Sequence, residues 1–345
     1  MRREEETEGF IQPDSYDTVM VSQQESMDQL SAHLDRGWEN LARGDLAAAE
    51  RSALRALDVD SLSAEAYQLR GAVVWTEGRV EEAIEAFEKS LELDPENPET
   101  MLYCAEVLAR DADRVVDARN MAEDALEIAE SRDLGGLQAQ AVVLLAELAL
   151  DAGNKARAET LLRRHQGVLH ENPALLERLG GLYVRLEEPG RAEEFLLKAI
   201  ETNHGGDSHY FLGHIYLDTG RADLVTDQFL AVRYHDVTGG PPAWTYGEDA
   251  FDLLCRDKVL AVSRSLDFPL DERRILVVDY PGVEAIMQGV DPRTPVYLGR
   301  EPDPSFAWFL VVYQLNVERA CSTPDDVPDL LENVVTSQFQ EVVEK

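Results

Sequence analysis

The chain has 345 residues, of which 32 are Lys or Arg and 67 are Asp or Glu, so its formal net charge at pH 7 is -35. A charge this negative argues against nucleic acid as a partner, because neutralising phosphates requires a basic surface, and against anionic membrane surfaces. No run of apolar residues is long enough to predict a membrane span, and the first ten residues lack the apolar segment of a signal peptide.

The cysteine and arginine content indicates the compartment and the source. Three widely spaced cysteines, Cys104, Cys255 and Cys321, fit a reducing environment better than a disulfide framework. Arg outnumbers Lys by 27 to 5, which indicates a GC-rich bacterial genome. We therefore expect a cytoplasmic bacterial protein.

The first segment, residues 1–29, is strongly acidic. It carries 2 basic and 8 acidic side chains, and we expect it to form a flexible arm. Two short apolar stretches interrupt it, Phe10-Ile11 and Val19-Met20-Val21. One hypothesis is that the arm folds back and places one of these stretches in a groove of the chain.

Residues 30–237 contain an internal repeat with a period of 34 residues, which is typical of stacked helix pairs. The first two copies match at Gly37, Asn40, Gly44, Ala49 and Ala56, which correspond to Gly71, Val74, Gly78, Ala83 and Ser90. Small residues allow the two helices of a copy to approach closely, and a glycine between them allows a tight turn. We expect six copies of two antiparallel helices.

The second copy resembles a tetratricopeptide repeat, with Tyr67, Gly71, Val74, Gly78, Ala83, Phe87 and Pro95 at the signature positions. The resemblance implies a right-handed α-solenoid whose groove is lined by the first helix of each copy. The groove positions that it implies are Leu34, Trp38, Gln68, Trp75, Leu102, Glu106, Arg110, Glu147, Tyr210 and His214.

An acidic and aromatic groove favours a protein or peptide partner with an apolar or basic segment. Some members of the family bind the C-terminal carboxylate of chaperone peptides with a Lys and an Asn. Leu34 and Trp38 occupy those positions here, so we exclude chaperone tails. The alternative role of Trp38 and Trp75 is packing between neighbouring repeats or burial under residues 1–29.

A Gly/Pro-rich linker at 238–247 separates the repeats from a small α+β domain predicted at 248–345. We expect an amphipathic helix over 248–266, a buried strand over 275–278 and two further strands near Thr294 and Ser305. A last helix follows, with Ser322 or Thr323 as its N-cap and Pro324 in its first turn.

The order of these elements over 250–345 resembles a minimal zincin-like metallopeptidase domain. The matching segments include Val277-Val278-Asp279-Tyr280-Pro281, Gly289 to Pro292 and Val317-Glu318-Arg319. The family's His-Glu-x-x-His window falls on Ser337 to Glu341, where Ser337 and Glu341 replace the zinc-binding imidazoles and Gln338 replaces the general base. We therefore expect no metal, no cofactor and no peptide hydrolysis.

The sequence thus predicts a mostly α protein, a tetratricopeptide solenoid followed by a degenerate zincin-like domain, that acts as a non-catalytic adaptor between proteins. The alternative is a metal-dependent hydrolase or metal-sensing domain that uses the carboxylates of Asp279, Glu318, Asp325 and Asp326. A solvated acidic surface is the competing interpretation of those four residues.

Overall fold

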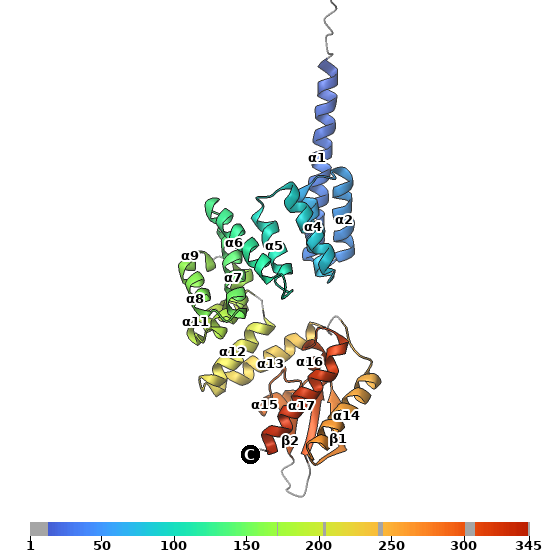
Figure 1. Ribbon diagram of the computed structural model, residues 1–345, viewed down its shortest axis with the longest axis vertical. Helices are drawn as coiled ribbons and strands as arrows, with labels where there is room; N and C mark the ends of the chain where they lie inside the picture. The colour runs from blue at the N-terminus through green and yellow to red at the C-terminus, as the bar shows by residue number, and fades with distance from the viewer. Residues whose placement is uncertain (1–12, 171, 203–204, 241–243, 301–307, 344–345) are drawn as a thin grey trace, which may run out of the picture. The chain divides into compact units, whose positions relative to one another are not determined.

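A computed structural model describes residues 13–170, 172–202, 205–240, 244–300 and 308–343 (Figure 1). The chain forms two compact units, Met1–Leu175 and Leu176–Lys345, called below the N-terminal and the C-terminal unit. No helix of the described residues is long and apolar enough to cross a membrane.

The described part of the N-terminal unit is entirely helical (Figure 1). Its helices are α1 (Pro13–Ala42), α2 (Leu46–Val59), α3 (Ala64–Thr76), α4 (Val80–Leu93), α5 (Pro98–Leu108), α6 (Val115–Ser131), α7 (Gly135–Asp151), α8 (Lys155–Arg164), α9 (Gln166–Leu169) and the short 3-10 helix η1 (Pro173–Leu175). The first eight form four consecutive pairs, α1 with α2 through α7 with α8, as the 34-residue period predicts.

Helix α1 begins much earlier than the repeat pattern indicates. Residues 13–29, expected to belong to a flexible arm, are its N-terminal part, whereas residues 1–12, including Phe10 and Ile11, lie outside the described residues. The sequence allows this extension, because Pro13 occupies the first helical position and no glycine follows before Gly37. Val19 to Val21, the second apolar stretch, therefore lie within a helix.

Each helix pair closes through small residues, as the pair α3/α4 illustrates. A Cβ atom added to Gly71 would lie 2.6 Å from Cε1 of Phe87, so a larger residue there would push the two helices apart. Gly78, in the turn between them, has a φ of +81°, which favours glycine. Both observations confirm the roles predicted for these glycines.

The C-terminal unit begins with two more helix pairs and continues into an α+β domain. The pairs are α10 (Leu176–Arg185) with α11 (Pro189–Glu201) and α12 (Gly206–Asp218) with α13 (Ala222–Thr238). The α+β domain comprises α14 (Glu248–Ser265), β1 (Leu270–Val278), α15 (Val283–Met287), β2 (Val296–Arg300), β3 (Trp308–Tyr313), α16 (Gln314–Arg319), the 3-10 helix η2 (Pro324–Asp326) and α17 (Val327–Val343).

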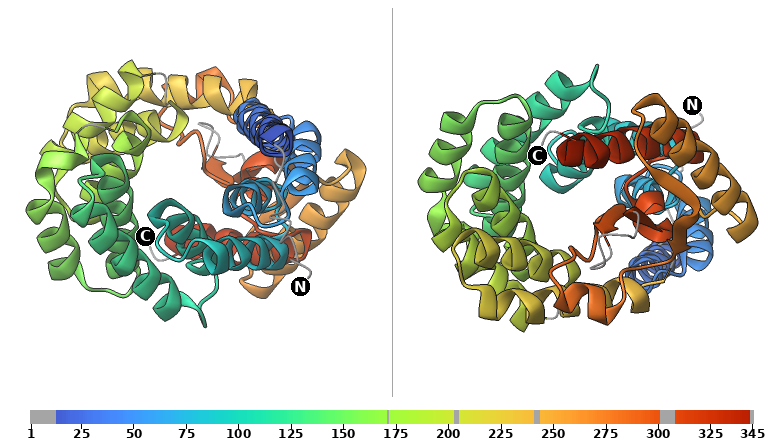
Figure 2. Two further views of the ribbon diagram at one scale, coloured as in Figure 1. Left: turned by 90° about the horizontal axis from the view of Figure 1, so that it is seen from above. Right: turned by 90° about the horizontal axis from the view of Figure 1, so that it is seen from below.

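The three strands form one sheet in the order β1-β3-β2, with β1 parallel and β2 antiparallel to the central strand β3. Ile275 pairs with Leu310, and Val296 pairs with Val312. Helices α14 and α17 pack against each other and against the sheet, as the views in Figures 1 and 2 show. Each of the three predicted strands is therefore present, but β1 is not buried as predicted: it lies at an edge of the sheet, and Leu276 and Val278 are exposed.

The core of the α+β domain lies between these helices and the sheet. Phe339 on α17 is fully buried and stacks on Phe268, with ring centroids 4.1 Å apart. Thr323 caps the last helical segment through a capping box with Asp326, and Pro324 follows directly, as the sequence predicts. A stable apolar core thus holds α17, the helix that carries the window Ser337 to Glu341.

Candidate functional site

A cavity of about 480 Å³ opens in the N-terminal unit among the first helices of three consecutive pairs, α1, α3 and α5. We call it the acidic pocket. Its lining residues are Trp38, Ala64, Glu65, Gln68, Asp94, Asn97, Glu99 and Tyr103.

Helix caps fix the starts of the two helices that supply most of the pocket. The side chain of Ser63 accepts a hydrogen bond from the backbone N–H of Ala66 at the start of α3. Asn97 does the same for Thr100 at the start of α5. Beyond the caps, Glu65 and Gln68 are three residues apart and Glu99 and Tyr103 are four apart, and such spacings place side chains on one helix face.

Three aromatic rings lead from the core to the pocket. The rings of Phe87 and Tyr103 stack with centroids 5.8 Å apart, and those of Tyr103 and Trp38 stack at 6.4 Å. Phe87 is fully buried in the core between α3 and α4. Because the innermost ring cannot move, the two rings that border the pocket are held in place by packing.

The carboxylates of the pocket have no cationic partner among the described residues. No ion pair among the described residues involves Glu65 or Glu99, and no Lys or Arg lines the cavity. Partial burial raises the pKa of Glu65, and the nearby negative charges of Asp35 and Glu99 raise it further. Burial likewise raises the pKa of Tyr103, together with the charges of Glu99 and Glu106.

Gln68 is the most buried polar residue of the pocket. Its side chain is only 3% exposed, yet it borders the cavity. No hydrogen bond of the described residues involves its carboxamide. The carboxamide therefore borders the cavity with hydrogen-bonding capacity that no described residue uses.

The groove residues that the sequence predicts lie in different surroundings in the structure. Trp38 and Gln68 line the acidic pocket, but Leu34 and Leu102, which the repeat period places in the same row as Gln68, are 5% and 4% exposed. These two leucines belong to the apolar cores of the repeats, and neither lines the acidic pocket. The structure thus brings Trp38 and Gln68, but not Leu34 and Leu102, to this cavity.

Four other predicted positions in the N-terminal unit lie outside the acidic pocket. The guanidinium of Arg110 stacks over the ring of Trp75 at 5.9 Å, so these two side chains contact each other. Glu106 and Glu147 each interact with other groups of the chain, and neither lines the pocket.

The last two predicted groove residues contact the chain's own α+β domain. The hydroxyl of Tyr210 donates to Oδ2 of Asp291 at 3.2 Å, and Nε2 of His214 lies 3.0 Å from the same oxygen. Burial opposes ionisation of Asp291, but the adjacent imidazole of His214 and the hydrogen bonds from the Arg293 backbone and the Tyr210 hydroxyl lower its pKa overall. In the C-terminal unit, therefore, a loop of the same chain occupies the positions expected to bind a partner.

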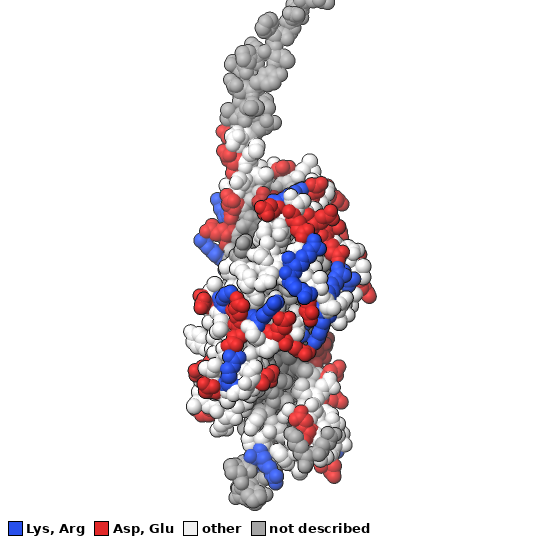
Figure 3. Space-filling model, turned by 90° about the vertical axis from the view of Figure 1, so that its left-hand side faces the viewer, with Lys and Arg blue, Asp and Glu red and all other residues white. Residues whose placement is uncertain are grey.

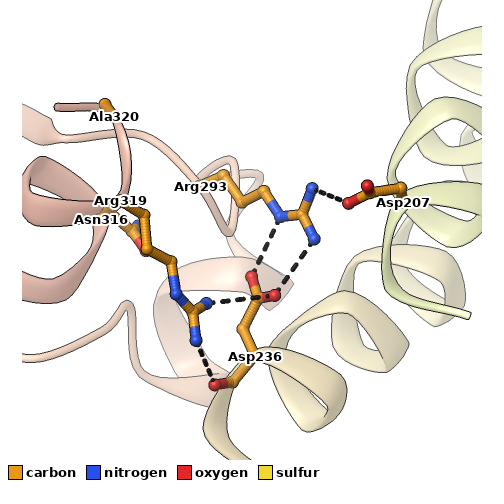
Figure 4. A pocket seen from close by; sticks show the side chains of 6 residues that line it. All are labelled: Asp207, Asp236, Arg293, Asn316, Arg319 and Ala320. Carbon is orange, nitrogen blue, oxygen red and sulfur yellow. Dashed lines mark hydrogen bonds and ion pairs between the residues drawn. The ribbon is translucent and has the colours of Figure 1, made fainter. Parts of the chain in front are cut away.

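A second polar cavity lies beside this contact, where helices α12 and α13 meet the α+β domain (Figure 4). We call it the arginine pocket; it has a volume of about 410 Å³ and is lined by Asp207, Asp236, Arg293, Asn316, Arg319 and Ala320. Figure 4 shows both guanidinium groups pointing at Asp236, which Arg293 contacts at 3.0 Å and Arg319 at 3.1 Å. Arg293 also pairs with Asp207 at 2.5 Å.

The window that replaces His-Glu-x-x-His lies near the end of α17. Ser337 and Glu341, one turn apart, are exposed, and Gln338 is partly buried. Between them Phe339 points into the apolar core. At this level the inward face of the helix is therefore apolar.

The four carboxylates of the alternative metal hypothesis serve separate structural roles or face solvent. Glu318 is 1% exposed and accepts hydrogen bonds from the Tyr246 backbone and the Gln314 side chain, each at 2.9 Å. Asp326 belongs to the capping box, and Asp279 and Asp325 are exposed. In the described part of the chain, no three His, Cys, Asp or Glu side chains are placed to hold a metal ion together.

The sequence did not predict Asp94, Asn97, Glu99 and Tyr103 in the acidic pocket, nor any part of the arginine pocket. Asp94 and Asn97 belong to the turn before α5, which carries no periodic signal, and Asn97 reads as a helix cap. Arg293 and Arg319 lie far from Asp236 in the sequence, so only folding brings these charges together.

Acidic side chains are spread over the face drawn in Figure 3, with basic side chains between them. The overall negative charge therefore does not identify the acidic pocket. The pocket is distinct because its carboxylates have no cationic partner among the described residues.

Comparisons with known proteins identify the repeats. Tetratricopeptide repeat family models match residues 34–98 and 74–141. No curated protein matches the chain. Among solved structures, Pseudomonas aeruginosa PilF superposes with a TM-score of 0.50 at 18% identity, covering 61% of this chain and 93% of PilF.

Two further solved structures are similar. PilW, described as a widely conserved type IV pilus biogenesis factor, has a TM-score of 0.50 at 16% identity and covers 59% of this chain and 92% of PilW. A tetratricopeptide repeat protein from Parabacteroides merdae has a TM-score of 0.47 at 18% identity, over 59% of this chain and 78% of that protein. At these identities the likeness concerns the fold alone. The chain therefore contains tetratricopeptide repeats, and proteins built from such repeats mediate contacts between proteins.

Proposed function

We propose that the chain is a non-catalytic scaffold whose tetratricopeptide repeats bind a segment of a partner protein at the acidic pocket. The supporting observation is the pocket itself, in which helices α1, α3 and α5 surround one cavity with aromatic rings and unpaired carboxylates. An apolar or basic partner segment matches both features.

The α+β domain acts in this proposal as a second docking surface without catalysis. Its likeness to a zincin-like metallopeptidase domain rests on the order of its elements, and Ser337, Gln338 and Glu341 replace the residues that would bind zinc and activate water. We expect the purified chain to show no chelator-sensitive peptide hydrolysis. One bound divalent ion per chain after dialysis would contradict this part of the proposal and support the metal-dependent alternative.

We place the protein in the cytoplasm, and its cysteines support this. Cys104, Cys255 and Cys321 are free, and burial raises the pKa of Cys104 and of Cys255 to about 12, so both remain unreactive thiols. Fractionation of the source cells followed by immunoblotting tests the placement; recovery from the envelope fraction would contradict it.

Affinity capture from the source cells tests the scaffold function. Wild type is compared with Trp38→Ala/Trp75→Ala, and each captured protein is then purified and titrated by calorimetry. We expect at least one partner that binds wild type directly and binds the double variant at least about tenfold more weakly, because aromatic anchors carry much of the binding energy at such surfaces.

The matched control is Leu54→Ala/Leu62→Ala, which removes two exposed apolar side chains of the same repeats outside the pocket. It should bind as wild type does, and far-UV circular dichroism should be the same for all three proteins. Equal affinity of wild type and Trp38→Ala/Trp75→Ala for every partner would overturn the assignment of the binding site.

A further inference from the structure

We propose that the acidic pocket holds the guanidinium group of an arginine side chain supplied by the partner, a proposal that rests on the scaffold function above. The group lies against the ring of Trp38 and donates hydrogen bonds to Glu65 and Glu99. The carboxamide of Gln68 accepts a further N–H of the same ligand.

The charge of the pocket is the first argument. Glu65, Asp94 and Glu99 border one cavity with no Lys or Arg among its lining residues. The like charges of Asp35 and Glu99 disfavour ionisation of Glu65. A bound cation relieves this repulsion, whereas an anionic or purely apolar ligand would increase it or leave it in place.

The amide of Gln68 is an independent argument for a ligand. It is 3% exposed, borders the cavity and has no hydrogen-bonding partner among the described residues. Solvated surface carboxylates by themselves indicate no ligand, whereas a mostly buried side chain that presents an unpaired carboxamide to a cavity offers a fixed hydrogen-bonding group. Its oxygen accepts from a guanidinium, which offers five N–H donors.

The aromatic rings favour arginine over lysine. Trp38 and Tyr103 border the same cavity and are fixed by the stack on Phe87. A planar guanidinium stacks on an aromatic face and still directs its N–H groups sideways at carboxylates, which a compact ammonium cannot do. The chain itself contains such a contact, because Arg110 stacks over Trp75 at 5.9 Å.

The experiment uses the full chain and three small probes, N-acetyl-arginine methylamide, its lysine analogue and its neutral isostere with citrulline. Binding is followed by the indole ¹H–¹⁵N signal of Trp38, assigned by loss of that signal in Trp38→Phe. We expect the arginine probe to bind at least about tenfold more tightly than the citrulline probe and several-fold more tightly than the lysine probe.

Two double variants with the same change of charge locate the effect. Glu65→Gln/Glu99→Gln should weaken binding of the arginine probe at least about tenfold. Glu81→Gln/Glu85→Gln, which changes two exposed carboxylates on α4 outside the pocket, should leave it unchanged. Gln68→Leu should weaken it several-fold, although the apolar side chain suits a buried position.

The outcomes separate this inference from the scaffold function. Equal binding of the arginine and citrulline probes, equal binding of the arginine and lysine probes, or equal effects of the two double variants would each overturn it. A natural partner whose affinity is unaffected by Glu65→Gln/Glu99→Gln would also overturn it while leaving the scaffold function intact. Selective binding of the arginine probe to a chain that captures no partner would support the pocket and contradict the scaffold function.

Discussion

The acidic pocket contains exposed carboxylates and the arginine pocket a buried one, Asp236, and their electrostatic situations are opposite. In the arginine pocket, Asp236 is contacted by two guanidinium groups of the same chain. In the acidic pocket, Glu65 and Glu99 have no cationic partner among the described residues. The difference indicates that the first pocket is a structural joint within the C-terminal unit, and that the second is suited to a cation from outside.

The titration of two carboxylates reflects the same contrast. The pKa of Glu65 is raised by burial and by like charges, whereas that of Asp291, beside the arginine pocket, is lowered by its hydrogen bonds although burial opposes them. Charge on Asp291 therefore stabilises the fold, and charge on Glu65 destabilises it. Substitutions at these carboxylates and at the residues packed around the two pockets should reveal this difference.

Asp236→Ala should give the largest effect, because it leaves the guanidinium groups of Arg293 and Arg319 without their shared partner. Since both are partly exposed, we expect the C-terminal unit to lose about 2–3 kcal/mol of its free energy of unfolding. Urea unfolding followed by the fluorescence of Trp244 and Trp308, in a Trp38→Phe/Trp75→Phe background, measures the loss. Asp207→Ala, which removes a more exposed partner of Arg293, is the control and should lose at most about 0.5 kcal/mol.

Gly71→Ala should destabilise the N-terminal unit by about 2 kcal/mol, because the added Cβ overlaps a buried ring. It would lie 2.6 Å from Phe87, the ring on which Tyr103 stacks, so binding of the arginine probe should weaken as well. Urea unfolding followed by the fluorescence of Trp38 and Trp75, with those in the C-terminal unit replaced by Phe, measures the stability. Gly136→Ala, where nothing lies within 4 Å, is the control; an equal loss there would contradict the packing argument.

Asp291→Asn should destabilise the C-terminal unit by about 1 kcal/mol at pH 7. The pKa of Asp291 is lower in the folded chain than the ordinary aspartate value of 3.8, so its contribution is fully present above that pH and is lost as the pH falls through the folded value. The difference in thermal midpoint between wild type and variant should therefore hold from pH 7 to about 4 and shrink below. A difference that stays constant into acid would contradict the assigned ionisation.

Glu65→Gln should have the smallest effect and the opposite sign. The pKa of Glu65 in the folded chain is above the ordinary glutamate value of 4.5, so its ionisation disfavours folding as the pH rises through that range. The variant should raise the thermal midpoint by about 1–2 °C at pH 7, less in high salt, and not at all near pH 4. Glu85→Gln, an exposed carboxylate outside the pocket, should change nothing; a lower midpoint for Glu65→Gln would mean that the carboxylate has a stabilising partner.

Periodicity predicted the helix pairs well because their packing is local. Gly71, Gly78 and Ala83 recur at fixed spacing, and each acts between two helices that are adjacent in the chain. The strand and helix order of the α+β domain was predictable for the same reason, since Ile275, Thr323 and Pro324 carry local signals. Residues 13–29 were misjudged because their acidity obscured an uninterrupted helical segment.

The candidate sites were predictable only in part. The repeat resemblance placed Trp38 and Gln68 at groove positions, and both border the acidic pocket, but it placed Leu34 and Leu102 there as well. One repeat position can be a core residue in one copy and a cavity wall in the next, because the neighbouring helices differ. No sequence rule indicated that His214 would contact a loop of the α+β domain.

The helix pairs, their small-residue contacts and the excess of negative charge follow from the sequence, because each depends on residue identity over short spans. Which carboxylates are neutralised depends on the packing of distant segments. Asp236 meets Arg293 and Arg319 because two distant segments pack together, whereas Glu65 and Glu99 come together from successive repeats with no Lys or Arg lining their cavity. Electrostatic interactions depend on distance in space and on burial, and neither quantity is encoded in the spacing of residues along the chain.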